Sequence, residues 1–198
     1  MSLIFSDKKQ EALVLLQLEK TVHSHAGEKV VFGYMPANAS KAKKYLDFWQ
    51  GFCDSKKYRF VFIDNSLSLK KSKKEHEKLR DCNVLLITGG NTYELLRNLR
   101  KSGFDEEIKK FSKRGDTVIA AFSAGAIVLG PSLRLLEGEW GALIDENIVG
   151  IKDIAGLGII QEEIFPHYRD VDEDKLKNYE KANKTKVIPL RDSEFLVV

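Results

Sequence analysis

The residues best suited to chemistry in this sequence surround Ser123, within residues 117–130. Small and β-branched apolar residues run into the serine, and Gly125 follows before a second apolar segment. This order predicts a buried strand, a sharp turn that carries the serine, and a helix that begins at once. Small neighbours such as Ala121 permit that turn. The hydroxyl would then lie at a helix amino terminus, where backbone N–H groups favour an oxyanion.

The serine motif is weak when it is taken alone. It departs from the G-x-S-x-G pattern of serine hydrolases because Ala121 replaces the first glycine. A pattern this short arises often by chance. A strand-to-helix turn with a buried structural serine is therefore an equally good interpretation until other residues are considered.

A second unusual turn is formed by Gly89-Gly90-Asn91-Thr92, which follows the apolar run at 83–88. Paired glycines allow a close backbone approach, and Asn91 or Thr92 can cap the next helix. If this strand neighbours the serine strand, N–H groups of Gly89 or Gly90 and of Ala124 could converge on one oxygen as an oxyanion hole. A simple turn with good capping chemistry explains the same residues and is the better interpretation of this motif alone.

The third candidate is His167, which follows the apolar residues Ile164 and Phe165 and the conformationally restricted Pro166. A rigidly held imidazole is what a serine nucleophile requires as its base. A structural histidine in the core remains the alternative. The remaining histidines lie in polar surroundings typical of solvated surface residues: His23, His25 and His76.

These residues would be positioned by alternating strands and helices. Apolar runs predict strands at 3–5, 29–34, 58–63, 83–88 and 117–122, and a last strand-like run lies at 195–198. Helical spacing predicts helices at 12–22, 40–52 with Ser40 as its cap, the second half of 68–80, 92–101 and 105–113. This alternation predicts an α/β fold with a mostly parallel sheet covered on both faces. Ligands in such sheets bind at the carboxyl ends of the strands.

Composition limits the class of protein. The 198 residues, with 43% hydrophobic and 31% charged residues, predict one globular domain spanning 1–198. It is an α/β domain by the alternation above, and a hydrolytic one if Ser123 is the nucleophile. A net charge of +3 and a lysine run at 70–74 without interleaved aromatics argue against a nucleic-acid partner. No apolar run is long enough for a membrane span, and no secretion signal is evident. Cys53 and Cys82 lack metal-ligand spacing, so we expect a cytoplasmic protein without a metal or other cofactor.

Several motifs in order resemble the peptidase E family, the aspartyl dipeptidases related to cyanophycinase. The matching residues are 89–96 (GGNTYELL), 122–126 (FSAGA), Pro131, 156–158 (GLG) and 165–168 (FPHY). The resemblance implies a flavodoxin-like three-layer sandwich, similar to class I glutamine amidotransferases. It also implies a serine-type peptidase with Ser123 as nucleophile and His167 as base, which hydrolyses dipeptides with an amino-terminal aspartate.

The chain departs from the family at the acid that orients the histidine. Where members resembling the bacterial dipeptidase carry an aspartate, the aligned residue here is Gly138. Glu137 is the favoured replacement. The carboxylates that also remain open for this role are Glu139, Asp145, Glu162 and Glu163.

Substrate preference is also open, since an aspartate side chain calls for a basic partner. Arg134 and Arg169 lie near motif residues. A serine esterase, a peptidase for other acidic or isoaspartyl ends, and a catalytically silent binding protein of this fold are the alternative functions. A homodimer is also left open by the apolar run at the end of the sequence.

Overall fold

The main sheet forms the centre of the computed structural model, which describes residues 1–5, 11–27, 29–138, 145–192 and 194–198. Across the sheet the described strands are, in order, β3 (Arg59–Phe62), β2 (Val31–Met35), β4 (Val84–Ile87), β5 (Val118–Phe122), β1 (Ser2–Phe5) and β8 (Phe195–Val197). All neighbours from β3 to β1 are parallel, and β8 joins β1 in the antiparallel direction. Counted from β2, the order 2-1-3-4 is that of a flavodoxin-like sheet. The predicted α/β class with a mostly parallel sheet is confirmed.

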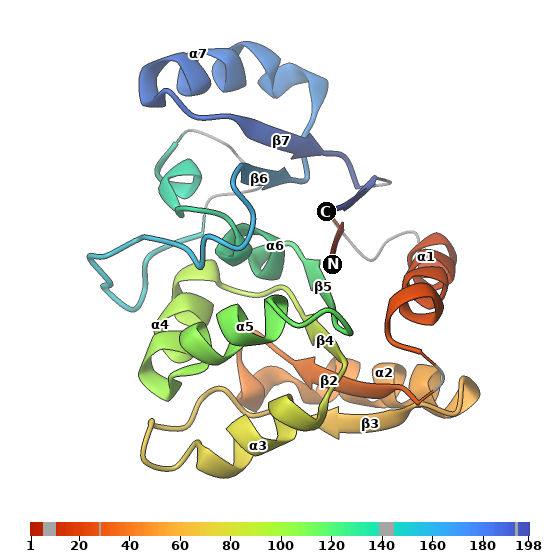
Figure 1. Cartoon of the computed structure of the whole chain (residues 1–198). Coiled ribbons are helices and arrows are strands. Elements are labelled where there is room, and N and C mark those ends of the chain that lie inside the picture. The colour runs from red at the N-terminus through yellow and green to blue at the C-terminus, as the bar shows by residue number, and fades with distance from the viewer. Residues whose placement is uncertain (6–10, 28, 139–144, 193) are drawn as a thin grey trace.

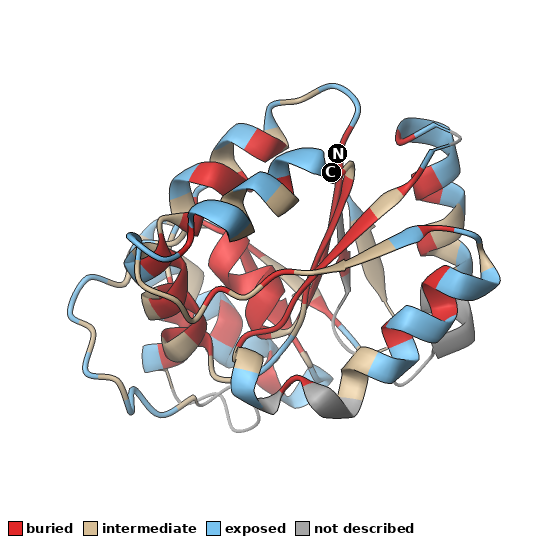
Figure 2. Ribbon diagram, turned by 90° about the horizontal axis from the view of Figure 1, so that it is seen from below, coloured by how far each residue is buried: buried red, intermediate tan, exposed pale blue. Residues whose placement is uncertain are grey.

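Helices cover both faces of this sheet, as Figures 1 and 2 show. On one face lie α1 (Glu11–His25) and α2 (Lys43–Ser55). On the other lie α3 (Lys73–Asp81), α4 (Thr92–Ser102), α5 (Phe104–Ser112) and α6 (Ala124–Leu129). Because side chains alternate along a strand, Leu86 belongs to the core under α2, whereas Leu85 and Ile87 belong to the core under α4. The central strands β2, β4 and β5 are thus buried on both sides, which explains their continuous apolar runs.

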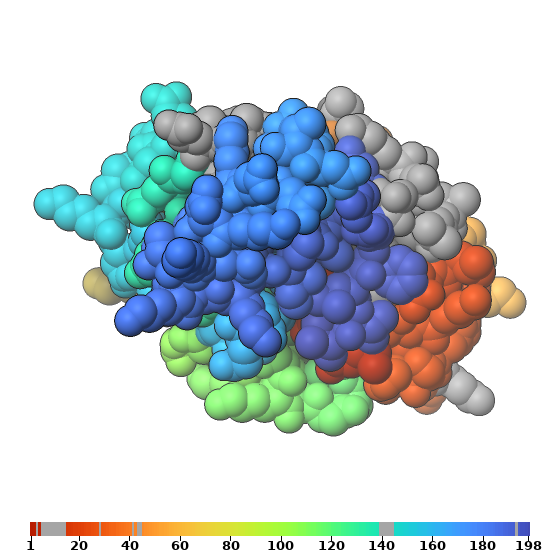
Figure 3. Space-filling model, turned by 90° about the horizontal axis from the view of Figure 1, so that it is seen from above, coloured from red at the N-terminus to blue at the C-terminus, as the bar shows by residue number. Residues whose placement is uncertain are grey.

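The C-terminal part of the chain adds a further layer over α6. It contains β6 (Glu163–Pro166), α7 (Glu173–Asn183) and β7 (Val187–Leu190), and β6 pairs with β7 in parallel. Figure 1 shows this layer at the top, and Figure 3 shows its blue segments gathered on the face seen from above. Short 3-10 turns are found at Ala39–Lys41, Arg134–Glu137 and Asp170–Asp172. The sequence pattern had not predicted β6, β7 or α7 as elements.

One predicted helix start is wrong. Ser40 does not cap α2, which begins at Lys43. Asn38 instead caps the short turn before the helix, because its side-chain oxygen accepts a hydrogen bond from the backbone N–H of Ser40 at 2.9 Å. In the described part of the chain, no helix has both the length and the apolar character needed to cross a bilayer.

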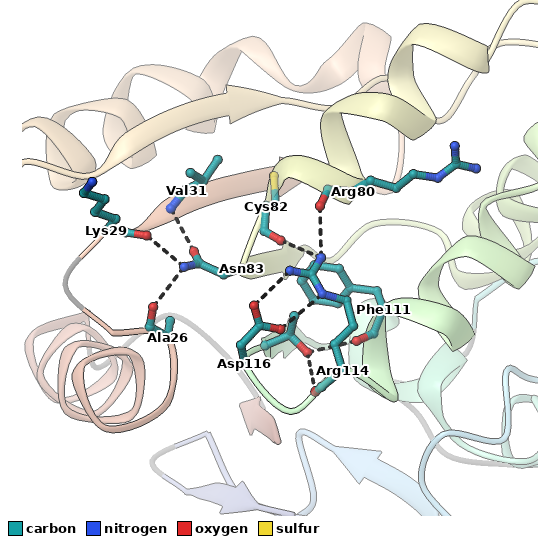
Figure 4. A network of polar contacts seen from close by, with 10 residues as sticks. Ala26, Lys29, Val31, Arg80, Cys82, Asn83, Phe111, Arg114 and Asp116 are labelled. Carbon is teal, nitrogen blue, oxygen red and sulfur yellow. Dashed lines mark hydrogen bonds and ion pairs between the residues drawn. The ribbon is translucent and has the colours of Figure 1, made fainter.

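Polar side chains fix the amino ends of the central strands, as Figure 4 shows. The Asn83 amide donates to the backbone carbonyls of Ala26 (2.9 Å) and Lys29 (2.8 Å). Its oxygen accepts from the N–H of Val31 at 2.8 Å. One side chain therefore joins the start of β4 to the loop that enters β2, and it satisfies backbone groups that the sheet leaves open.

Arg114 likewise joins the segment before β5 to backbone carbonyls before β4. Its guanidinium donates to the carbonyls of Arg80 and Cys82, both at 3.0 Å, and pairs with Asp116 at 3.1 Å (Figure 4). The Arg114 group holds the pKa of Asp116 below its usual range. These contacts lie at the end of the sheet opposite the serine turn, where they stabilise the strands without entering the site.

Glu107 of α5 offers a test of stability against pH. Its side chain accepts from Arg80 (2.9 Å) and Lys110 (3.0 Å), and these contacts, Arg80 first, lower the pKa of Glu107 to about 2. A depressed carboxyl pKa stabilises the fold above the unfolded value, near 4.3, and this contribution is lost as pH falls toward 2. We expect Glu107→Gln to lower the free energy of unfolding by about 1 kcal/mol at pH 7.

The difference between the Glu107 variant and the parent should shrink as pH falls from about 5 to 2. Urea unfolding curves of both proteins at several pH values measure this difference in the free energy of unfolding. A constant difference across this range would show that the Glu107 charge does not stabilise the fold.

Candidate active site

Ser123 lies in the sharp turn between β5 and α6. Its backbone angles, φ 48° and ψ −113°, fall in a region that side chains rarely adopt. The turn is tight because α6 packs closely on β4: a Cβ added at Gly125 would come within 2.5 Å of the Ile87 carbonyl oxygen. Gly125 is therefore required for helix packing, and the strained turn presents the Ser123 hydroxyl beyond the end of the strand.

His167 faces this hydroxyl. Its Nε2 lies 3.1 Å from Ser123 Oγ, although the two residues are 44 positions apart. His167 directly follows β6 and also has a positive φ, 60°. Positive φ occurs at four described residues other than glycine, and two of these hydrogen-bond to each other here. Such strain persists only where the surrounding structure imposes it, and it is concentrated at functional sites.

The second ring nitrogen of His167 contacts Asp192, which follows β7. Nδ1 lies 2.7 Å from Asp192 Oδ1. A carboxylate accepts but cannot donate, so Nδ1 carries the proton and Nε2 is left as an acceptor for the Ser123 hydroxyl. Ser123, His167 and Asp192 thus stand at the carboxyl ends of three strands, β5, β6 and β7, and form one hydrogen-bonded chain.

Neighbouring residues fix the segment that carries the Asp192 carboxylate. Arg191 pairs with Asp170 and Glu194, and its guanidinium lies 5.3 Å from the centroid of the Tyr168 ring. The Tyr168 N–H donates to the Leu190 carbonyl at 3.1 Å, which continues the ladder between β6 and β7. The residues next to His167 therefore hold the residues next to Asp192, so base and acid are positioned together.

Two backbone segments adjoin Ser123, the β4–α4 turn and the first turn of α6. A Cβ placed on Gly89 would lie 3.2 Å from Ser123 Cβ, so a larger residue would crowd the close approach of the β4–α4 turn to the serine. Gly90 has φ 152°, in the region that favours glycine. Ala124 is the first residue of α6, and N–H groups in a first helical turn lack intrahelical acceptors. Asn91 is the cap of α4, with its side chain accepting from the Glu94 N–H.

The expected acid, Glu137, is not at the histidine. It is exposed at the end of a 3-10 turn. Burial is the main cause that raises the pKa values of Tyr93 and Tyr179, and the charge of Glu137 adds to both shifts. Asp192 occupies the position at Nδ1 instead. Two more of the carboxylates considered from the sequence are engaged elsewhere: Asp145 accepts from Thr92, whereas the buried Glu163 accepts from Ser132 and Tyr179.

Glu162 lies at the wrong end of β6 to orient His167. It directly precedes this strand, whereas His167 directly follows it, so the length of β6 separates the two residues. Glu139 lies outside the residues that the structure describes.

A signal for Asp192 was present in the sequence, because the apolar run 187–190 ends two residues before it. Interpreting that run as a strand would have placed Asp192 at a strand end, as for Ser123 and His167. The run is short and contains a proline, Pro189, which weakens its signal as a strand.

The cysteines are poorly suited to nucleophilic chemistry. Burial raises the pKa values of Cys53 and Cys82 to about 12, so their thiols stay protonated at neutral pH. Among the described residues, no group of three or more His, Cys, Asp or Glu side chains is arranged to hold a metal ion.

Sequence comparison finds relatives named peptidase E at modest identity. Relatives include a peptidase E from Streptomyces coelicolor, 29% identical over 131 residues, which cover 61% of this chain and 51% of the relative. A peptidase E from Citrobacter koseri is 32% identical over 90 residues, covering 46% of this chain and 36% of the relative. The chain thus spans about half, or less, of the length of these curated relatives.

Two crystal structures share the fold at low sequence identity. A protein assigned to peptidase E from Listeria monocytogenes EGD-e has a TM-score of 0.72 and 20% identity, covering 100% of this chain and 93% of that chain. A peptidase from an acI-B1 Actinobacterium has a TM-score of 0.64 and 18% identity, and the match covers 98% of this chain and 81% of that chain. The model of peptidase family S51 matches residues 3–198, and the chain belongs to this family.

Proposed function

We propose that this protein is a serine-type peptidase that hydrolyses short peptides through an acyl-enzyme on Ser123. The observation that carries the proposal is the hydrogen-bonded chain from Ser123 Oγ through His167 to Asp192. A serine hydroxyl is a weak nucleophile unless a base removes its proton, and the base works best when a third group fixes its tautomer. The sequence motifs and membership of a peptidase family support the same reaction class.

In the proposed reaction, His167 Nε2 takes the hydroxyl proton while Ser123 Oγ attacks the scissile carbonyl. The oxyanion that forms accepts hydrogen bonds from the N–H of Ala124 and from that of Gly89 or Gly90. His167 then gives its proton to the leaving amine, and Asp192 stabilises the imidazolium in between. Water, activated by the same imidazole, attacks the acyl-enzyme and releases Ser123.

The finer proposal is that the preferred substrates are dipeptides with an amino-terminal aspartate, as the family resemblance implies. The two arginines considered from the sequence are engaged in different contacts. Arg169 pairs with Asp172 at 3.0 Å, and Arg134 donates to Asn183 at 3.3 Å. Neither contact identifies a cationic partner for an aspartate side chain, so the preference has to be measured directly.

The test combines active-site labelling with a substrate panel. We expect a fluorophosphonate probe to modify Ser123 in the folded protein but not in urea, because only the folded chain holds His167 against the hydroxyl. Mass spectrometry of peptides locates the label. In parallel, dipeptides that begin with Asp, Glu or Leu are incubated with the protein, and released amino acids are quantified.

Each outcome of this test assigns a different function. Fastest cleavage of the aspartyl dipeptide would support the full proposal. Labelling of Ser123 with hydrolysis of p-nitrophenyl acetate but of no dipeptide would overturn the peptidase in favour of an esterase. Absence of both labelling and hydrolysis would indicate a catalytically silent binding protein.

A further inference from the structure

A hollow of about 310 Å³ lies beside the nucleophile, between the turns that follow β2 and β4. Its described lining comprises Tyr34, Pro36, Ala37, Asn38, Ala42, Tyr45, Thr88, Gly89, Gly90, Asn91 and Glu94. Gly89 connects the hollow with the nucleophile, since it lines the hollow and also packs against Ser123 Cβ. A group bound in the hollow is therefore separated from the serine only by the glycine turn.

The hollow lies on the acyl side of the proposed reaction. Across the sheet, β4 and β2 lie on one side of β5, whereas Asp192 precedes β8 on the far side, beyond β1. His167 must protonate the leaving amine, so the leaving residue lies toward His167 and Asp192. The residue that acylates Ser123 then extends the opposite way, past Gly89 into the hollow. In a dipeptide, this residue is the amino-terminal one.

Glu94 provides the charge in this hollow. Its side chain is only 14% exposed. Both contacts that fix the carboxylate fall on Oε1: Asn38 donates to it at 2.7 Å, and the Arg97 guanidinium lies 3.8 Å away. Among the described residues, no hydrogen bond or ion pair of this carboxylate uses Oε2. A partly buried carboxylate held through one oxygen has its second oxygen available for a cationic ligand.

Apart from Glu94, the described lining of the hollow carries no charged side chain. The Tyr34 hydroxyl is enclosed by protein atoms rather than open to the hollow, so Glu94 is the group that a ligand would meet there. No Lys or Arg side chain is among the described lining residues.

We propose that this hollow binds the amino-terminal residue of the peptide and that Glu94 pairs with its free α-ammonium. This inference rests on the proposed peptidase function and deepens it. Glu94 would be a specificity-determining residue, since a blocked amino terminus would leave its partly buried carboxylate facing a neutral amide. Sites built to pair a charged group reject analogues that lack it. The protein would then act only on peptides with free amino termini.

The kinetic test compares aspartyl p-nitroanilide with its N-acetyl form. We expect the parent to prefer the free amine, and Glu94→Gln to raise KM for it roughly 10- to 100-fold while kcat changes little. The preference for free over acetylated substrate should fall by the same factor. Glu106→Gln is the control, because this exposed carboxylate pairs with Lys109 in α5, outside the hollow.

A binding test separates this inference from the proposed function. In Ser123→Ala protein, calorimetry of an aspartyl dipeptide and its N-acetyl form measures recognition without turnover. We expect tighter binding of the free form, and loss of that difference when Glu94→Gln is added. An unchanged difference would overturn the role of Glu94 even if Ser123 is labelled by a fluorophosphonate. A Glu94-dependent difference without labelling would support the binding site and reject the peptidase.

Discussion

Ser123→Ala is expected to lower kcat/KM for peptide hydrolysis by about 10⁴-fold or more and to abolish fluorophosphonate labelling. The hydroxyl is the atom that forms the acyl-enzyme, so no neighbouring group can replace it. Substrate binding should persist, because the hollow and the backbone donors remain. Discontinuous assays of released amino acids measure the loss of kcat/KM. Circular dichroism checks that the variant is folded.

Two further variants sharpen this prediction. Ser123→Gly should be inactive but more stable than Ser123→Ala by about 1 kcal/mol, because glycine adopts the turn at φ 48° without strain. Ser112→Ala is the matched control, since that serine donates to the Lys109 carbonyl at the end of α5. Retention of near-parental activity in Ser123→Ala would refute the proposed nucleophile.

Asp192→Asn is expected to reduce kcat by about 10²- to 10⁴-fold with little change in KM. The amide of Asn can donate to Nδ1, which would place the imidazole proton on Nε2 and point it at Ser123. His167 could then not accept the hydroxyl proton. Asp192→Ala removes the orienting contact without imposing the wrong tautomer, so we expect it to lose no more activity than the Asn variant.

Glu137→Gln tests the competing assignment of the acid. Its carboxylate is exposed and lies beside Tyr93 and Tyr179, so this change should leave kcat within about twofold. A large loss for Glu137→Gln together with normal activity of Asp192→Asn would reverse the assignment made from the geometry. Equal, small effects of both would show that His167 needs no orienting carboxylate.

The sheet and its helices were predictable because their signals are local. Apolar runs at 83–88 and 117–122 became β4 and β5, and helical spacing at 92–101 became α4, each within a residue or two. Such runs are long, continuous and bounded by glycine or polar residues, so periodicity alone identifies them. The error at Ser40 arose from a cap two residues earlier, at Asn38, which serves a short turn rather than the helix.

The site was predictable only in part. Ser123 and His167 carry local motifs, and each was assigned before their contact could be known. The acid carries no motif, because any carboxylate that the fold brings to Nδ1 can hold the ring. The family resemblance pointed to Glu137, next to the aligned Gly138, whereas the carboxylate at Nδ1 in the structure is that of Asp192, after the end of β7. Tertiary arrangement decides that choice, and the pairing of β6 with β7 was not evident in the sequence.

The pairing of β8 with β1 has a consequence for how heat would inactivate the molecule. The segment that bears Asp192 is anchored at one end by the small sheet and at its far end by an edge strand of three residues. Edge strands of this length open more readily than a central sheet. Turnover should therefore decline on warming while most of the ellipticity survives, so that the catalytic machinery melts as a separate, weaker unit within an otherwise intact molecule.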